Sequence, residues 1–294
     1  MPGVAGDVSS KGFWSRFLLP GGVWLLLLFV VPICLVLALS FGYTDDLGRA
    51  VYSFGLENYQ DAFDPLYIPV LLRSIGFAVA TAAFCLLLGY PIAYYIARYG
   101  GRRKHILIAL LVIPFFVNYL VRTYAWVALL ADEGLVNSAL KDLGLTETGI
   151  QFVNTPYAVV GGLVYGYLVF MILPIYASLE RMDGSLIEAG KDLFGTPSRV
   201  FMHVTLPQTK QGILAGCVLV FLPAVGDFVS AQLLGGPDTY MVGNLIQDQF
   251  FAASNWPFGS ALTVVMMLFL SIWMLGYLRS AAREARDPVA AGGV

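Results

Sequence analysis

A single carboxylate inside an apolar stretch is the group of this chain best placed to act on a charged solute. Asp227 lies in LPAVGDFVSAQLLGG, where it is the only charged residue. Ionisable groups are costly in an apolar medium and usually face a bundle interior or a water-filled path. Pro223 and Gly226 precede Asp227, so we expect a kinked or unwound helix with backbone carbonyls open to a cavity. A carboxylate beside free carbonyls suits an ammonium group, which makes Asp227 a candidate for the lining of a solute path.

Two arginines in other apolar stretches offer Asp227 a structural alternative. Arg122, in NYLVRTYAW, could pair with Asp227 or extend its charge outwards along the membrane. Because a positive charge facing a cation path would bind poorly, we favour a structural role for Arg122. Arg73 begins its stretch and is expected to reach the membrane surface. An ion pair between Asp227 and either arginine would hold helices together without binding a solute.

Aromatic side chains could form walls of the same path. Stacking over a ring would add cation–π attraction of about 0.5–2 kcal/mol to the binding of an ammonium group. Aromatic belts at membrane interfaces explain many such residues without any ligand, and this alternative stays open. The aromatic residues assigned to the candidate path are Tyr94, Tyr119, Tyr124 and Trp126.

No constellation for bond-making chemistry is present in the sequence. His105 and His203 are the only histidines, and the three cysteines lie in apolar runs without paired spacing. The stretch GSLIEAGKD suggests a phosphate loop, but its glycine spacing is one residue too long, and Asp192 stands where Ser or Thr must bind magnesium. We therefore predict no catalytic residue, no cofactor and no metal site, and an intramembrane enzyme is the weakest interpretation.

The composition places these residues in a membrane. The chain is 58% hydrophobic and 12% charged, against roughly 45–50% and about 25% in soluble domains. Its mean hydropathy is +0.76. A net charge of -2 gives no reason to expect nucleic acid as a partner. The sequence therefore predicts an all-α, polytopic protein embedded in a lipid bilayer.

Six stretches reach the ~20 residues that a transmembrane helix needs. The first exceeds the apolar core of a signal peptide and has no small-residue cleavage site after it, so we expect a retained span. Flanking these spans we expect an N-terminal segment, 1–17, and a C-terminal tail, 281–294, around a six-span domain of residues 18–280. The spans are 18–41, 70–97, 106–131, 157–179, 212–235 and 258–279.

The distribution of charge predicts the orientation of the spans. Thirteen of the seventeen Lys and Arg residues fall on one side, which the positive-inside rule assigns to the cytoplasm together with both termini and the 180–211 loop. The opposite loops carry eleven acidic residues and two basic ones. Depletion of Lys and Arg by the same rule explains this acidic face, and attraction of cationic solutes or a basic partner is the alternative.

The 180–211 loop contains residues that are typical of helix starts and helix ends. Ser185 and Glu188 match a capping box, which predicts the start of a helix. Gly195 can stop that helix, and Pro197 can begin a second one. Two short helices at an angle, with apolar side chains and flanking charges, would form a compact docking surface.

The spacing of this loop carries a family resemblance. Glu188-Ala189, a glycine six to seven residues later and a Leu206-Pro207 stop resemble the EAA loop of ABC-importer permeases, which forms coupling helices that fit a groove on a cytoplasmic ATPase subunit. Gly190 replaces the second alanine of the family pattern, and Phe194 occupies its usual glycine position. The residues that the resemblance assigns to coupling are Ser185, Glu188, Ala189, Gly190, Asp192, Phe194, Gly195, Pro197, Leu206 and Pro207.

Further phrases extend the resemblance from about residue 13 to residue 280. LENYQDAF, LLLGYPIAYYIAR and NWPFGSAL resemble the first permease of bacterial spermidine/putrescine importers. The resemblance implies a type I importer permease in the bacterial inner membrane. It also implies a second homologous permease, two copies of an ATPase subunit that bind ATP and magnesium, and a periplasmic solute-binding protein.

Two alternatives stay open after the resemblance. The same architecture serves importers of thiamine, iron, phosphonate or sulfate. A secondary transporter could use Asp227 as a proton or cation site, but it would need inverted internal repeats, of which we see none that is clear, and would leave the loop at 188–207 unexplained.

Overall fold

The structure, a computed structural model, describes residues 11–45 and 47–286. Residues 1–10 and 287–294, which belong to the expected N-terminal segment and C-terminal tail, lie outside the described residues. The chain divides into two compact units. One holds the described residues up to Phe63 together with Gln249–Met267, and the other holds Asp64–Asp248 and the described residues from Leu268 on.

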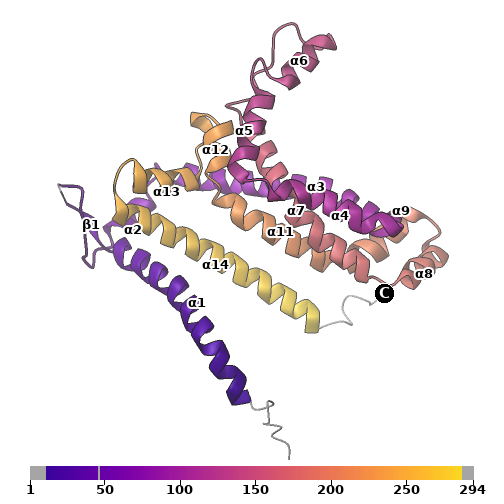
Figure 1. The fold of residues 1–294 in the computed structure, drawn as a ribbon, viewed down its shortest axis with the longest axis horizontal. Coiled ribbons are helices and arrows are strands. Elements are labelled where there is room, and N and C mark those ends of the chain that lie inside the picture. Colours follow the sequence, from indigo (N-terminus) through magenta and orange to yellow (C-terminus); the bar gives the residue numbers. More distant parts are fainter. Residues whose placement is uncertain (1–10, 46, 287–294) are drawn as a thin grey trace, which may run out of the picture. The chain divides into compact units, whose positions relative to one another are not determined.

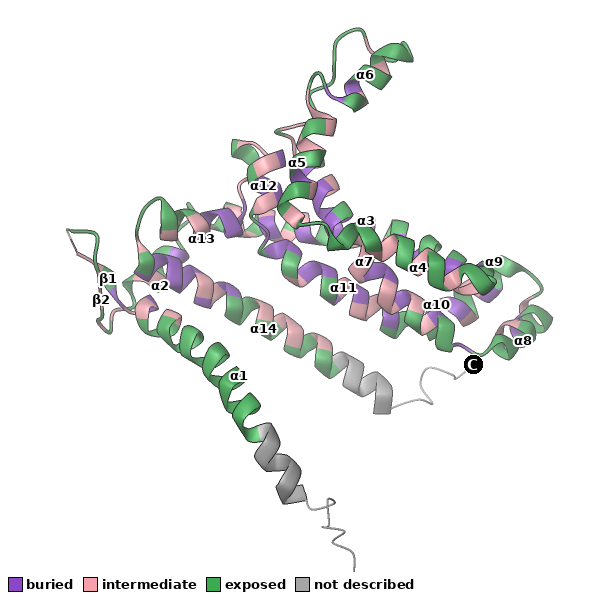
Figure 2. Cartoon of the chain, viewed as in Figure 1, coloured by how far each residue is buried: buried purple, intermediate pink, exposed green. Residues whose placement is uncertain are grey.

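The first unit is built on one long apolar helix. Helix α1 spans Lys11–Ser40, and from Leu19 on it forms a candidate membrane span that is exposed almost throughout (Figure 2). A helix that is apolar all round needs lipid or another protein against it. The strands β1 (Tyr43–Thr44) and β2 (Ala50–Val51) pair as a short antiparallel hairpin, and α2 (Glu57–Ala62) follows.

Side-chain hydrogen bonds join the residues that follow α1 to one another and to the start of α14. Asn58 donates its amide to the carbonyls of Ser40 and Gly42, at 3.0 and 2.7 Å. Thr44 donates to the side-chain carbonyl of Asn255 at 2.9 Å, which ties the hairpin to the start of α14 (Trp256–Arg286). These bonds connect the end of α1 with α2, and the hairpin with the start of α14.

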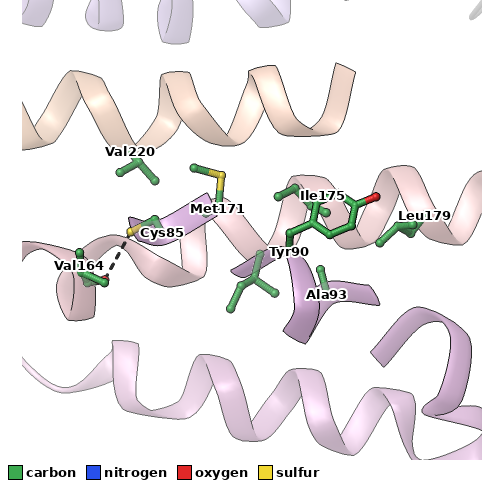
Figure 3. Close-up of a cluster of buried hydrophobic side chains, with 9 residues drawn as sticks. Cys85, Tyr90, Ala93, Val164, Met171, Ile175, Leu179 and Val220 are labelled. Atoms are coloured by element: carbon green, nitrogen blue, oxygen red, sulfur yellow. Dashed lines mark hydrogen bonds between the residues drawn. The ribbon is translucent and has the colours of Figure 1, made fainter. Parts of the chain in front are cut away.

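Three helices form the core of the second unit. Helices α3 (Ile68–Tyr99), α7 (Pro156–Arg181) and α11 (Lys210–Val225) run side by side (Figure 1). Their apolar side chains gather in one buried cluster (Figure 3). The buried members of this cluster are Cys85, Tyr90, Ala93, Val164, Met171, Ile172, Ile175, Leu179 and Val220.

Two glycines allow α11 to approach α7 closely. A Cβ atom added at Gly212 would lie 2.6 Å from the Ser178 Cβ, and one added at Gly216 would lie 2.6 Å from the Met171 sulfur. Gly212 and Gly216 are four residues apart, the small-residue spacing that brings membrane helices into backbone contact. We infer that α7 and α11 form a rigid pair.

The remaining elements of the second unit lie at the two ends of this core. At one end are α5 (Tyr119–Leu130), α6 (Leu135–Asp142), α12 (Val229–Leu234), the turn η4 (Pro237–Thr239) and α13 (Val242–Phe251). At the other end lie α8 (Gly184–Phe194) and α9 (Pro197–Val200) (Figure 1). The core helices therefore connect the two ends of this unit.

Four described helices are long and apolar enough to span a membrane, and the predicted bounds of these four spans are close. They are Leu19–Ser40, Ile68–Tyr99, Pro156–Arg181 and Trp256–Arg279. The count reaches six if each of two bent helix pairs is one span. The fold is thus an all-α membrane protein, and its orientation stays a prediction.

The region of the predicted span 106–131 is a broken helix in the structure. The structure places η1 (Gly101–Arg103), α4 (Lys104–Val112), η2 (Ile113–Phe116) and α5 in this region, and the two halves are bent by 90°. Pro114 lies within the tight η2 turn. Asn118 then accepts the Leu120 amide at 2.9 Å and starts α5 as a new helix.

The predicted span 212–235 is also interrupted. Helix α11 ends at Val225, residues 226–228 are not helical, and the short α12 follows. This is the unwound segment expected from Pro223 and Gly226, so that expectation is confirmed.

Candidate functional site

The break between α11 and α12 places Asp227 in a buried polar centre. Its side chain is only 6% exposed. The Tyr119 hydroxyl donates to Asp227 Oδ2 at 2.6 Å, and the Tyr167 hydroxyl donates to the same oxygen at 2.8 Å. The Ser230 amide donates to Oδ1 at 2.8 Å, so the carboxylate caps the first turn of α12. Helices α5, α7 and α12 therefore converge on one carboxylate.

The hydrogen bonds of this centre have a defined direction. Tyr119 has one hydroxyl proton and gives it to Asp227. The 2.7 Å bond between the Tyr119 and Ser230 hydroxyls must then be donated by Ser230. All three donors to Asp227 are electrically neutral, and among the described residues no ion pair reaches it. The centre thus holds a buried carboxylate without a positive partner.

The alternative pairing of Asp227 with Arg122 or Arg73 is not found among the described residues. The guanidinium of Arg122 lies over three aromatic rings, at 5.4 Å from Phe115, 5.6 Å from Tyr119 and 5.9 Å from Tyr165. It is held by cation–π contacts, in keeping with a structural role. Instead of reaching outwards, Arg73 donates to the Tyr240 carbonyl at 3.3 Å and fastens α3 to the segment before α13.

The expectation that backbone carbonyls open to a cavity at the break is wrong for the Phe228 carbonyl. The Phe228 carbonyl accepts the Asn244 side-chain amide at 3.0 Å. The Gly226 carbonyl lies so close to Gly243 that a Cβ there would be 2.5 Å away. Packing of α13 against the break thus occupies the Phe228 carbonyl and brings Gly243 close to the Gly226 carbonyl.

A polar cavity of about 250 Å³ lies between α12 and α13. The Tyr240 hydroxyl donates to Asp248 Oδ2 at its edge, at 2.5 Å. Burial, followed by this bond and the Asp248 charge, raises the pKa of the Tyr240 hydroxyl above its ordinary value, so Tyr240 stays a donor at neutral pH. The lining residues are Ala231, Gln232, Gly235, Gly236, Pro237, Tyr240, Asn244 and Asp248.

Only one of the four aromatic residues assigned to the path adjoins Asp227. That residue is Tyr119. The Trp126 ring packs against the Tyr165 ring, with centroids 5.4 Å apart, and Tyr124 is 58% exposed. Tyr94 lies at the other end of the core, with its ring 6.1 Å from Phe201. The structure therefore does not bring Tyr94, Tyr124 and Trp126 together with the carboxylate.

Two partners of Asp227 were not assigned from the sequence. Tyr167 lies 60 residues before Asp227 in the chain, and nothing local indicates the contact. Ser230 could have been found, because an Asp followed by a free amide three residues later is the pattern of a helix N-terminus. Because the helix is unwound at Gly226, the Asp227 side chain can accept from the Ser230 amide at the start of α12.

The segment assigned to coupling forms two helices, as expected, but the capping box is wrong. Helix α8 begins at Gly184, and Asp183 caps it by accepting the Ser185 amide at 3.0 Å. Ser185 thus lies in the first turn of the helix. The stop at Gly195 is confirmed, because this residue has a φ of 69° and its amide bonds to the Lys191 carbonyl at 2.9 Å.

The second helix of this segment continues past the predicted Leu-Pro stop. After α9 the chain forms η3 (Phe201–Thr205), a π-helix, and then α10 (Leu206–Gln208). Pro207 lies in the first turn of α10, directly after the π-helical turn η3. The bend falls two residues later, at Thr209, and the helices before and after it differ by 63°.

The two departures from the family pattern have packing partners. A Cβ at Gly190 would lie 3.0 Å from Val204 and 3.2 Å from Val200, so glycine lets α8 press against α9 and η3. The Phe194 ring stacks on His203 at 5.0 Å. The two helices therefore form one compact hairpin.

Charged and apolar side chains cover the outer face of this hairpin. Leu193 is 79% exposed and Leu186 is 42% exposed, large fractions for leucines in an ordered helix. Glu188, Ala189 and Asp192 are exposed between them. This mixture of apolar and acidic groups is suited to docking on another protein.

We expect Asp183→Ala to raise the hydrogen-exchange rate of the first amides of α8, because the Ser185 amide loses its acceptor. Asp183→Asn keeps an acceptor and is the matched control. The bond from the Ser185 amide lowers the pKa of the Asp183 carboxyl. Its stabilisation is therefore full above the ordinary carboxyl pKa of about 3.9 and is lost as the pH falls through the lower folded value. Equal exchange in Asp183→Ala and wild type would contradict the cap.

Taken together, broken apolar helices around an unpaired carboxylate and an exposed amphipathic hairpin define a membrane transport protein. Residues 86–286 match the family described as binding-protein-dependent transport system inner membrane component. The chain belongs to this family and is a multi-pass permease subunit of the inner membrane.

Curated relatives share most of the chain. It is 39% identical over 257 residues to the spermidine/putrescine transport system permease protein PotB of Haemophilus influenzae, covering 87% of this chain and 90% of that one. The Escherichia coli K12 protein of the same name is 38% identical over 258 residues, covering 88% and 94%.

A solved structure supports the same fold. A chain of a bacterial alginate ABC transporter, crystallised with a periplasmic protein bound to an alginate pentasaccharide, superposes with a TM-score of 0.72. The match covers 94% of this chain and 96% of that chain at 17% identity. At this identity the likeness concerns the fold, which is that of an ABC-importer permease.

Proposed function

We propose that this permease forms the path for polyamines, spermidine and putrescine in particular, through an ATP-driven importer. The observation that carries the proposal is the Asp227 carboxylate, buried in the membrane region and bonded only to neutral donors. A buried charge normally has an opposite charge beside it. An ammonium group of the solute would supply that charge during passage, and the similarity to PotB proteins agrees with such a solute.

The tyrosines would make this binding reversible. In the described state, Tyr119 and Tyr167 fill the acceptor positions of Asp227 Oδ2. An arriving ammonium would replace one of these hydroxyls, and the phenol rings beside it would add cation–π attraction. When the solute leaves, the hydroxyls return, so the carboxylate is never without hydrogen bonds.

The energy for transport would come from a partner. The exposed face of α8 would dock on an ATP-binding subunit, present in two copies, and ATP and magnesium would bind there and not to this chain. A second, homologous permease would complete the path, and a periplasmic solute-binding protein would deliver the polyamine. The solved importer relative that includes a periplasmic protein supports this assembly.

The test is solute-stimulated ATP hydrolysis by the lipid-reconstituted complex with its binding protein. We expect stimulation by spermidine or putrescine and none by thiamine, iron, phosphonate or sulfate. Stimulation by one of those solutes alone would replace the polyamine and keep the permease. If no ATPase subunit co-purifies, proton-coupled transport through Asp227 takes the place of ATP coupling.

A further inference from the structure

The elbow between α10 and α11 is held by a side-chain bond to a distant helix. Thr209 forms the elbow and is completely buried. The hydroxyl of Tyr90, on α3, lies 3.0 Å from the Thr209 hydroxyl. Tyr90 itself is 8% exposed, so water has little access to the bond. A bond between residues 119 positions apart is a specific tertiary link.

A count of the hydroxyl protons identifies Tyr90 as the donor of this bond. Thr209 has one hydroxyl proton, and its hydroxyl oxygen lies 3.0 Å from the Thr205 carbonyl oxygen and 3.2 Å from the Leu206 carbonyl oxygen, both on the coupling side of the elbow. With that proton shared between the two carbonyls, the Thr209 oxygen accepts from Tyr90. Tyr90 is thus connected through one hydroxyl to the turn that precedes α11.

The ring of Tyr90 makes a second contact with the coupling side. It meets the Phe201 ring edge-on, with centroids 5.5 Å apart and an interplanar angle of 89°. Phe201 opens the π-helix η3, and π-helical turns are often found at functional sites. Tyr90 therefore holds both the start of η3 and the elbow, two points on the segment that follows α9.

On the membrane side, Tyr90 lies in a closely packed core. A Cβ at the preceding Gly89 would lie 3.2 Å from Ile172 and 3.3 Å from Met171, so α3 lies tightly on α7 at this level. Figure 3 shows Tyr90 within the buried cluster of α3, α7 and α11. Any force on the Tyr90 side chain is therefore passed to all three core helices.

We propose that Tyr90 is a positioning residue for transport, whose bond to Thr209 makes the elbow a rigid joint between the coupling hairpin and the core. The inference rests on the proposed coupling of α8 to an ATPase subunit. Without the bond, the segment before the elbow would keep its apolar contacts with the core, made by Phe201 and Leu206, but would lose its directional hydrogen bond at the residue where the helix direction changes by 63°. Movement of the hairpin would then bend the elbow before it moved α3 and the Asp227 centre at the far end of the core.

The test compares Tyr90→Phe with wild type in the reconstituted complex. Tyr90→Phe keeps the ring and its Phe201 contact and removes only the hydroxyl. We expect the amount of solute moved per ATP hydrolysed to fall about fivefold, the factor that corresponds to one lost buried hydrogen bond. Thr209→Val should do the same, and Thr209→Ser, which retains a hydroxyl, should restore coupling. Tyr95→Phe is the matched control, because Tyr95 is exposed on the same helix.

Hydrogen exchange of residues 201–213 in the full chain provides a readout that needs no ATPase. Faster exchange in Tyr90→Phe, but not in Tyr95→Phe, is expected from a loosened joint. Unchanged exchange, or an unchanged ratio of transport to hydrolysis in an assembled complex, overturns the proposal. If wild type shows no solute-stimulated hydrolysis while exchange still responds to Tyr90→Phe, the proposed function has failed and the joint has not.

Discussion

Asp227→Asn is expected to lower polyamine transport at least tenfold while the complex still assembles. Asparagine keeps the size of the side chain and an oxygen that can accept from Tyr119 or Ser230, but it removes the negative charge. Two unit charges 4 Å apart attract by about 4 kcal/mol at an effective dielectric constant of 20. Loss of a third of this attraction already corresponds to about a tenfold change in affinity.

The measurement is uptake of labelled spermidine into proteoliposomes that contain the complete complex. Asp142→Asn, a change of the same kind at an exposed position of α6, is the control and should transport as wild type does. Wild-type uptake by Asp227→Asn would show that the carboxylate is structural and would remove the basis of the polyamine proposal.

Asp227→Ala should behave differently from Asp227→Asn. It leaves the Tyr167 hydroxyl and the Ser230 amide without their acceptor, while Tyr119 keeps its bond to the Ser230 hydroxyl. Each unsatisfied buried group costs about 1–3 kcal/mol. We therefore expect a lower yield of folded protein for alanine than for asparagine. Comparing Asp227→Asn with Asp227→Ala distinguishes the effect of the charge from the effect of the hydrogen bonds of the same side chain.

Glu188→Lys is expected to abolish co-purification of the ATPase subunit without destabilising the permease. Glu188 is exposed on α8, and within the described residues its side chain has no hydrogen bond or ion pair. A substitution at such a position usually changes stability by less than about 0.5 kcal/mol. Because no described residue bonds to the Glu188 side chain, loss of the ATPase would be a direct effect on the docking surface.

Affinity purification of the tagged permease, followed by quantification of the bound ATPase subunit, measures this effect. Glu147→Lys makes the same charge reversal at an exposed loop position outside the coupling segment, and it should leave binding unchanged. Normal ATPase binding by Glu188→Lys would contradict the proposal that α8 docks through this residue.

Long uninterrupted apolar runs were predictable to within two residues. The expected spans 70–97 and 157–179 correspond to Ile68–Tyr99 and Pro156–Arg181. Hydropathy alone sets such bounds, because every backbone group in lipid must be bonded within the helix. Hydropathy did not reveal the bend at Asn118, since a broken apolar helix and a straight one have the same composition.

Local signals decided most of the coupling segment. A left-handed Gly195 ends α8, and Pro197 begins α9, as their residue types predict. The capping box failed because Asp183, two residues before Ser185, reaches the same amide group and starts the helix earlier. The fit of Gly190 against Val200 and Val204 depends on how the two helices cross, which the spacing of residues does not encode.

The sequence by itself determined that this chain lies in a membrane and that its helix unwinds at a buried carboxylate. These are local consequences of apolar composition and of Pro223, Gly226 and Asp227. Only the tertiary structure decided that the carboxylate binds two tyrosines and no arginine, because Tyr119 and Tyr167 come from helices 108 and 60 residues away. The partner of a buried charge is chosen by which helices pack around it, and that choice belongs to the whole bundle.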